Sequence, residues 1–137
     1  MMRRTSVANQ RLAIKTNVGY LNVVGSLVAC RGQRPFAFLM TSTGPIDYGA
    51  TVQLRVGSKT IVVDPATSEM HAVGLMHPGQ IVDFVIKPLR GSGPTFVDGS
   101  EFALLSSHGC VRCSDGNVKV GGAVDTDAPA RLIALFR

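Results

Sequence analysis

The chain has 137 residues, of which 45% are hydrophobic and 17% are charged, with 15 glycines and seven prolines. This length suits a single domain, and the apolar content excludes a disordered tail. No run of about 18 apolar residues occurs, so no membrane span is predicted.

The first ten residues, MMRRTSVANQ, form a basic arm without the apolar stretch of a secretory signal. No acidic residue precedes Asp47. Mitochondrial import, or membership of a mitochondrial or ribosomal complex, is therefore kept as an alternative location and role.

The formal net charge is +5, and the whole excess lies in the first third of the chain. Residues 41–90 are neutral and residues 91–137 carry one net negative charge. A lopsided basic face attracts acidic partners over about 8–10 Å at physiological salt. We predict a partner-binding face, or in the alternative a solvated surface, made by Arg3, Arg4, Arg11, Lys15, Arg31 and Arg34.

In chain order, the pattern of apolar runs and turns predicts three similar four-strand units after the arm, at about residues 11–40, 51–87 and 101–137. Gly/Pro/Ser clusters at 41–45 and 90–94 separate the units. The predicted strands of the first unit are 12–14, 20–24, 27–29 and 36–39. Those of the second are 52–54, 60–63, 70–72 and 82–86, and those of the third are 102–106, 110–114, 118–120 and 131–136. Asp115-Gly116 predicts a two-residue hairpin turn in the third unit.

Three four-strand units in one short chain resemble the β-trefoil. The resemblance implies an all-β fold of twelve strands with pseudo-threefold symmetry and one domain over residues 1–137. Six strands would close a short barrel, and six would cap it as three hairpins.

The three cysteines, Cys30, Cys110 and Cys113, are an odd number, and without a secretory signal they predict reduced thiols in a cytosol-like compartment. A zinc site at Cys110-x-x-Cys113 would need two more ligands. Positions i and i+3 of a strand also point to opposite faces. We therefore predict buried core thiols and no metal site.

No catalytic residues or cofactors are predicted. His108 and Cys110 could form a nucleophile pair, but no orienting Asn or Asp is identifiable. Asp125-x-Asp127 lacks the glycine and glutamate of a calcium loop. The glycine-rich stretches 91–93 and 121–122 do not precede a helix with a Lys-Ser/Thr pair.

Two trefoil groups resemble parts of the chain. Gly19-Tyr20-Leu21 and the run 35–39, PFAFL, look like the fascin and hisactophilin group of actin-associated proteins, although the loop histidines of hisactophilin are absent. The run 48–54, YGATVQL, is similar to the unit start of trefoil proteins of ciliary doublet microtubules, with Ala50 in place of the usual acid. Ricin-type lectins differ, because their repeats carry a tryptophan and this chain has none.

These resemblances imply a non-catalytic structural protein of the cytoplasm, cytoskeleton or cilium. It would dock on the acidic surface of actin filaments, ciliary microtubules or another large assembly. A carbohydrate-binding module is the alternative. Because the phenylalanines are predicted to lie in the core, only Tyr20 and Tyr48 could offer an aromatic surface to a sugar ring. Scarce stacking aromatics argue against nucleic acid.

Overall fold

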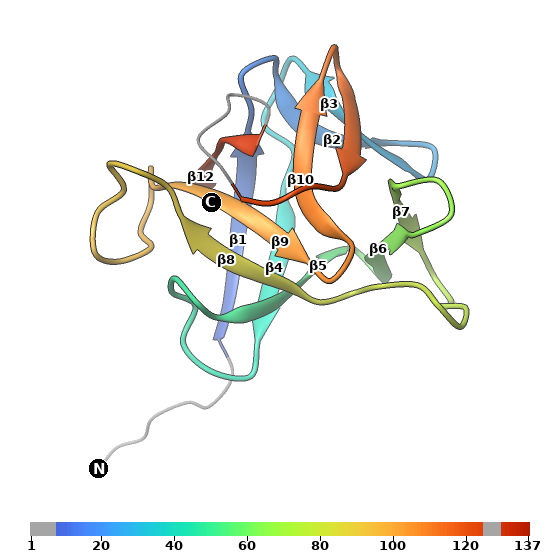
Figure 1. The fold of residues 1–137 in the computed structure, drawn as a ribbon, viewed down its shortest axis with the longest axis horizontal. Helices are drawn as coiled ribbons and strands as arrows, with labels where there is room; N and C mark the ends of the chain where they lie inside the picture. Colours follow the sequence, from blue (N-terminus) through green and yellow to red (C-terminus); the bar gives the residue numbers. More distant parts are fainter. Residues whose placement is uncertain (1–7, 125–129) are drawn as a thin grey trace.

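The computed structural model describes residues 8–124 and 130–137 and places twelve β-strands and no α-helix within them. Figure 1 shows these strands wrapped around a common interior. The all-β prediction is confirmed. The strands are β1 (Ala8–Lys15), β2 (Tyr20–Val24), β3 (Leu27–Gly32), β4 (Phe38–Ser42), β5 (Thr51–Val56), β6 (Lys59–Asp64), β7 (Glu69–Val73), β8 (Phe84–Pro88), β9 (Glu101–Ser106), β10 (Gly109–Ser114), β11 (Asn117–Val120) and β12 (Leu132–Phe136).

The turns between strands follow local sequence. Asp115 and Gly116 have φ angles of 56° and 84°, as a type I′ hairpin requires, and Ser114 pairs with Asn117 on either side of them. The predicted hairpin at Asp115-Gly116 is therefore confirmed.

The β-trefoil prediction is wrong. The strands form a closed antiparallel barrel of ten strands with two outer strands. The closed circuit runs β1–β4–β5–β6–β7–β3–β11–β10–β9–β12 and returns to β1. Outer strand β2 pairs with β1 and β3, and outer strand β8 pairs with β5 and β9.

The physical reason lies in the bonds between hairpins. The trefoil prediction treated three hairpins as separate caps, but backbone pairing joins them to their neighbours. Leu27 of β3 pairs with His71 of β7, and Asn117 of β11 pairs with Ala29 of β3. Pairing between β9 and β10 completes one continuous sheet. Such edge-to-edge bonds leave no mark in the pattern of apolar residues.

Alternate apolar side chains fill the barrel, since successive residues of a strand point to opposite faces. Five strands of the circuit and the outer strand β8 each send two such side chains into one buried cluster: Leu12 and Ile14, Phe38 and Met40, Val52 and Leu54, Phe84 and Ile86 (β8), Phe102 and Leu104, and Leu132 and Ala134. Of the residues between them, Leu39, Gln53, Val85 and Ile133 are partly exposed on the outside of the barrel, whereas Ala13 and Ala103 are buried.

The prediction that the cysteines are buried is confirmed, but the prediction of reduced thiols is wrong for two of the three. Cys30 of β3 and Cys113 of β10 form a disulfide across a sequence separation of 83 residues. The hairpin pairing of β11 with both β3 and β10 brings the two strands close, which spacing in the sequence does not reveal. Cys110 is buried in a second, smaller cluster with Leu89, Ala103 and Ala130. Cys110 and Cys113 thus face different clusters, as expected for positions i and i+3 of a strand.

Candidate functional site: the outer face of the barrel

The described members of the predicted basic face lie on β1, on β3 and in the loop after β3. Arg11 and Lys15 are exposed on the outer face of β1, four residues apart. Arg31 is exposed on β3, where its side chain lies over Gly116, and Arg34 is exposed in the loop that follows. Arg3 and Arg4 lie outside the described residues.

Arg11 instead belongs to a row of arginines that crosses neighbouring strands. The backbone N–H of Arg137 donates to the Arg11 carbonyl at 2.9 Å, which places Arg137 beside Arg11. On the other side Arg11 pairs with Leu39, and Leu39 pairs with Arg55. We call Arg137, Arg11 and Arg55 the arginine row. With adjacent strands about 4.8 Å apart, it spans about 14 Å.

The arginine row has no acidic partner within the described ranges. The ion pairs found there join Glu69 to His71 and Lys119, and Glu101 to Arg131. Arg11 and Arg137 are exposed and Arg55 is half-buried. Arg11 and Arg137 of the row therefore face solvent, and the nearest acid that the backbone bonds show is Asp98, which accepts from the Phe136 N–H at 2.8 Å.

Sequence reasoning missed Arg55 and Arg137. It grouped cations by their nearness along the chain, whereas strand register groups them across the sheet. Only the pairing of β12, β1, β4 and β5 brings these residues together.

A second row of residues, none of them cationic, crosses β1, β4 and β5. On each strand it lies two residues away from the arginine row. Asn9 pairs with Thr41, and Thr41 pairs with Gln53. The side-chain amide of Gln53 donates to Asp83 Oδ1 at 3.1 Å. We call Asn9, Thr41, Gln53 and Asp83 the polar row.

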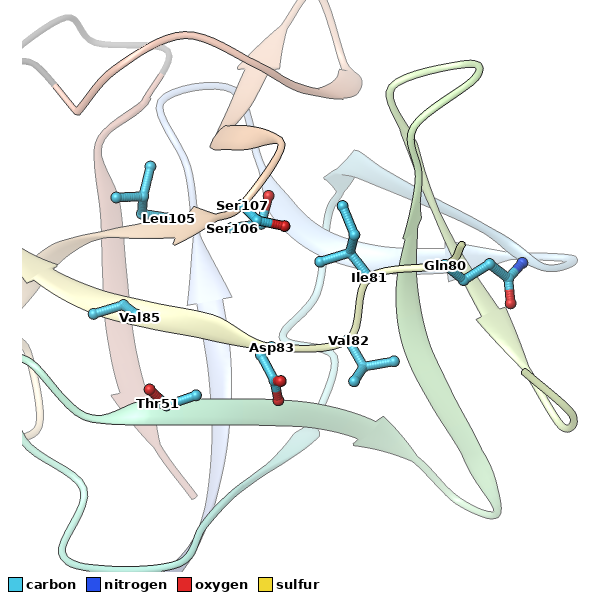
Figure 2. A pocket seen from close by; sticks show the side chains of 9 residues that line it. All are labelled: Thr51, Gln80, Ile81, Val82, Asp83, Val85, Leu105, Ser106 and Ser107. Carbon is cyan, nitrogen blue, oxygen red and sulfur yellow. The ribbon is translucent and has the colours of Figure 1, made fainter. Parts of the chain in front are cut away.

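Two hollows adjoin the polar row and share Thr51 and Asp83. The smaller has a volume of about 290 Å³ and is lined by Thr51, Gln53, Asp83 and residues 41–43. The larger has a volume of about 500 Å³. Figure 2 shows the larger hollow, with Thr51 on β5, Val85 on β8, Asp83 just before β8, and Ser106 and Ser107 at the end of β9 and just after it.

Residues 80–82 form one wall of the larger hollow, and backbone bonds hold this wall in place. Ile81 and Val63 exchange two N–H···O bonds of 2.7 and 3.1 Å. Gln80 Oε1 accepts from the His77 N–H at 2.8 Å. Backbone hydrogen bonds therefore fix this wall to β6.

The two tyrosines do not form open sugar platforms. Tyr48 is half-buried, its hydroxyl donates to the Glu101 carbonyl at 2.9 Å, and its ring meets Phe96 edge-on at 5.8 Å. Tyr20 is half-buried between Lys15 and Gly32. A carbohydrate site built on stacking aromatics therefore has no support at these positions.

The remaining candidate chemistry separates in space. Across residues 8–124 and 130–137, no group of three or more His, Cys, Asp or Glu side chains could hold a metal ion. Cys113 is bonded to Cys30, and the ring Nε2 of His108 lies 3.0 Å from Ser68 Oγ. Asp125 and Asp127 fall outside the described part of the chain.

No protein-family model matches this chain, and no curated protein matches it. In the part of the chain that the structure describes, no helix is long and apolar enough to cross a membrane.

Proposed function

We propose that this protein is a non-catalytic binding module that docks through the arginine row on the acidic protein surface of a filament or larger assembly. The observation that carries the proposal is the alignment of Arg137 after β12, Arg11 on β1 and, beyond β4, Arg55 on β5, with no acidic partner among the described residues.

Guanidinium groups suit this role. Each has a planar fork of N–H donors that matches a carboxylate, and it is hydrated more weakly than an ammonium group. A barrel wall holds the backbones of the three arginines at fixed spacing, so less conformational entropy is lost on binding than from a flexible tail. Carboxylates on a repeating polymer would meet such a row in one orientation.

The other predicted cations have a secondary part in this proposal. Lys15, Arg31 and Arg34 are exposed outside the row, on β1, on β3 and in the loop after β3. They would raise the association rate through long-range attraction rather than make the central contacts. Actin filaments and ciliary doublet microtubules, which present repeated acidic surfaces, are the first partners to test.

Co-sedimentation with actin filaments and with microtubules tests the proposal. We expect salt-sensitive pelleting of the wild type. The triple variant Arg11→Gln/Arg55→Gln/Arg137→Gln should bind about tenfold more weakly, since three exposed charge pairs together contribute about 1.5 kcal/mol.

A matched control removes the same charge elsewhere. The variant Lys15→Gln/Arg31→Gln/Arg34→Gln should lose much less affinity at physiological salt. Equal losses in the two variants would show that net charge, and not the row, is responsible. No pelleting with either polymer would reject both named partners.

A further inference from the structure

We propose that the two hollows beside the polar row form a binding site for a neutral saccharide. This site is separate from the arginine row and recognises a different chemistry. It does not depend on the docking function proposed above.

The size and shape of the hollows suit a small ligand. The larger hollow, at about 500 Å³, falls within the range of about 300–1,000 Å³ that is usual for small-molecule sites. The smaller adds about 290 Å³ along the same strands. Because both include Thr51 and Asp83, one extended ligand could occupy the two hollows together. The lining polar residues Thr41, Gln53 and Asp83 cover two strand spacings, about 10 Å, which favours a short oligosaccharide over a single ring.

The polar groups present both donors and acceptors. Asp83 is exposed, and one of its oxygens accepts from Gln53 at 3.1 Å, which orients the carboxylate. Its second oxygen can accept from the hydroxyls of a ligand. The hydroxyls of Thr51 and Thr41 can both donate and accept. A ligand with many hydroxyl groups matches this set.

An apolar strip accompanies these polar groups. Val85 pairs with Thr51 on one side and with Leu105 on the other. Both Val85 and Leu105 are half-buried and line the larger hollow. The C–H face of a sugar ring can pack on such aliphatic side chains while its hydroxyls reach the polar row. Without an aromatic platform, we expect weak affinity, with a Kd of about 1 mM.

The charges decide against an anionic ligand. Among residues 8–124 and 130–137 no cation lines either hollow, and Asp83 would repel a phosphate, a sulfate or a uronic acid. Asp83 alone could attract a cationic amine, but an amine would leave the hydroxyls and the aliphatic strip without a role. The neutral saccharide is therefore the ligand that uses every part of the site.

A titration followed by NMR tests this proposal on the full ¹⁵N-labelled chain. The probes are maltotriose, cellotriose, triacetylchitotriose and lactose, each added to tens of millimolar. We expect at least one of them to cause saturable shifts at the amides of Thr51, Gln53 and Asp83. Asp83→Ala should weaken that binding about tenfold or more, and Thr51→Val should weaken it severalfold.

Two controls separate this site from other effects. Thr95→Val alters an exposed threonine outside both hollows and should bind as the wild type does. The arginine-row triple variant should also bind the saccharide normally, with no dependence on salt, even if its docking on filaments fails. Dispersed amide spectra of every variant verify that each is folded.

Three results would overturn the proposal: no saturable shift with any probe, shifts that map elsewhere on the barrel, or saccharide binding that survives Asp83→Ala unchanged. Spermidine serves as the cationic probe. If spermidine alone shifts the amides of the polar row, the site is a cation site and the saccharide proposal is wrong.

Discussion

Gly109, at the start of β10, is a residue that the tertiary structure leaves no freedom to change. Its backbone φ angle is 130°, a conformation that residues with a side chain rarely adopt. A Cβ built on Gly109 would lie 2.5 Å from the Cα and 2.6 Å from the carbonyl carbon of Gly121. These contacts are with backbone, so no rotamer change can relieve them. Gly109 is thus required by both conformation and space.

We expect Gly109→Ala to lower the free energy of unfolding by about 2 kcal/mol or more, since strained φ and a backbone clash act together. The neighbouring Gly121→Ala is the matched control, because a Cβ there meets nothing within 4 Å. It should change stability by about 0.5 kcal/mol or less. Urea unfolding of the two variants makes the comparison, and equal midpoints would contradict this reading of the turn.

At the scale of elements, the disulfide between β3 and β10 is the main covalent constraint. It joins positions 83 residues apart, so it restricts the unfolded chain over more than half of its length. Thr16 Oγ1 lies 3.4 Å from Cys113 Sγ and accepts N–H bonds from Val18 and Gly19. The disulfide is therefore packed against the β1–β2 turn as well as against its own two strands.

We expect reduction to destabilise the wild type by about 2–5 kcal/mol, as is usual for a native disulfide in a small domain. Urea unfolding with and without a phosphine reductant measures the difference. The variant Cys30→Ala/Cys113→Ala should not respond to the reductant. Intact mass under non-reducing conditions should be lower than after reduction by two hydrogen atoms, and an unchanged mass would show that the disulfide does not form.

The disulfide also bears on where the protein works. Disulfides persist in oxidising compartments and are rare in the cytosol. A cytosol-like location therefore no longer follows from the cysteines. The docking face lies on strands other than those that the disulfide joins. The filament assays proposed above should therefore be run on both the oxidised and the reduced protein.

At the scale of the whole molecule, closure of the barrel depends on its last strand. β12 pairs with β1 over four residue pairs and with β9 over two. It also carries Leu132 and Ala134, which are completely buried in the core. Without β12, β1 and β9 would each have an open edge beside an exposed apolar interior.

We expect a chain that ends at Val124 to lose cooperative unfolding. Thermal unfolding of the truncated chain, followed by circular dichroism, should show no sharp transition. The amide NMR spectrum of the truncated chain should lack dispersion. Adding a peptide of residues 125–137 to the truncated chain should partly restore the transition if edge pairing is the cause. A truncated chain that unfolds cooperatively would show that the barrel closes without β12.

Much of the strand pattern was predictable. Each of the twelve predicted runs overlaps a strand of the structure, and the Asp115-Gly116 turn lies where expected. The closure was predicted wrongly, because a β-trefoil and the observed ten-strand circuit require the same local pattern. Of the candidate site, Arg11 was predicted, whereas Arg55, Arg137 and the polar row were not.

The sequence by itself determined the all-β class, the positions of the strands and the hairpin turns. Apolar alternation and glycine or aspartate at turns are local properties, so they can be seen without knowing which strands are neighbours. Only the tertiary structure decided the order of the sheet, the disulfide and the two rows of the outer face. Each of these depends on residues that are distant in sequence and are brought together by hydrogen bonds between strand edges. Backbone N–H and C=O groups can form such bonds whatever the sequence, so the sequence pattern does not show which edges pair.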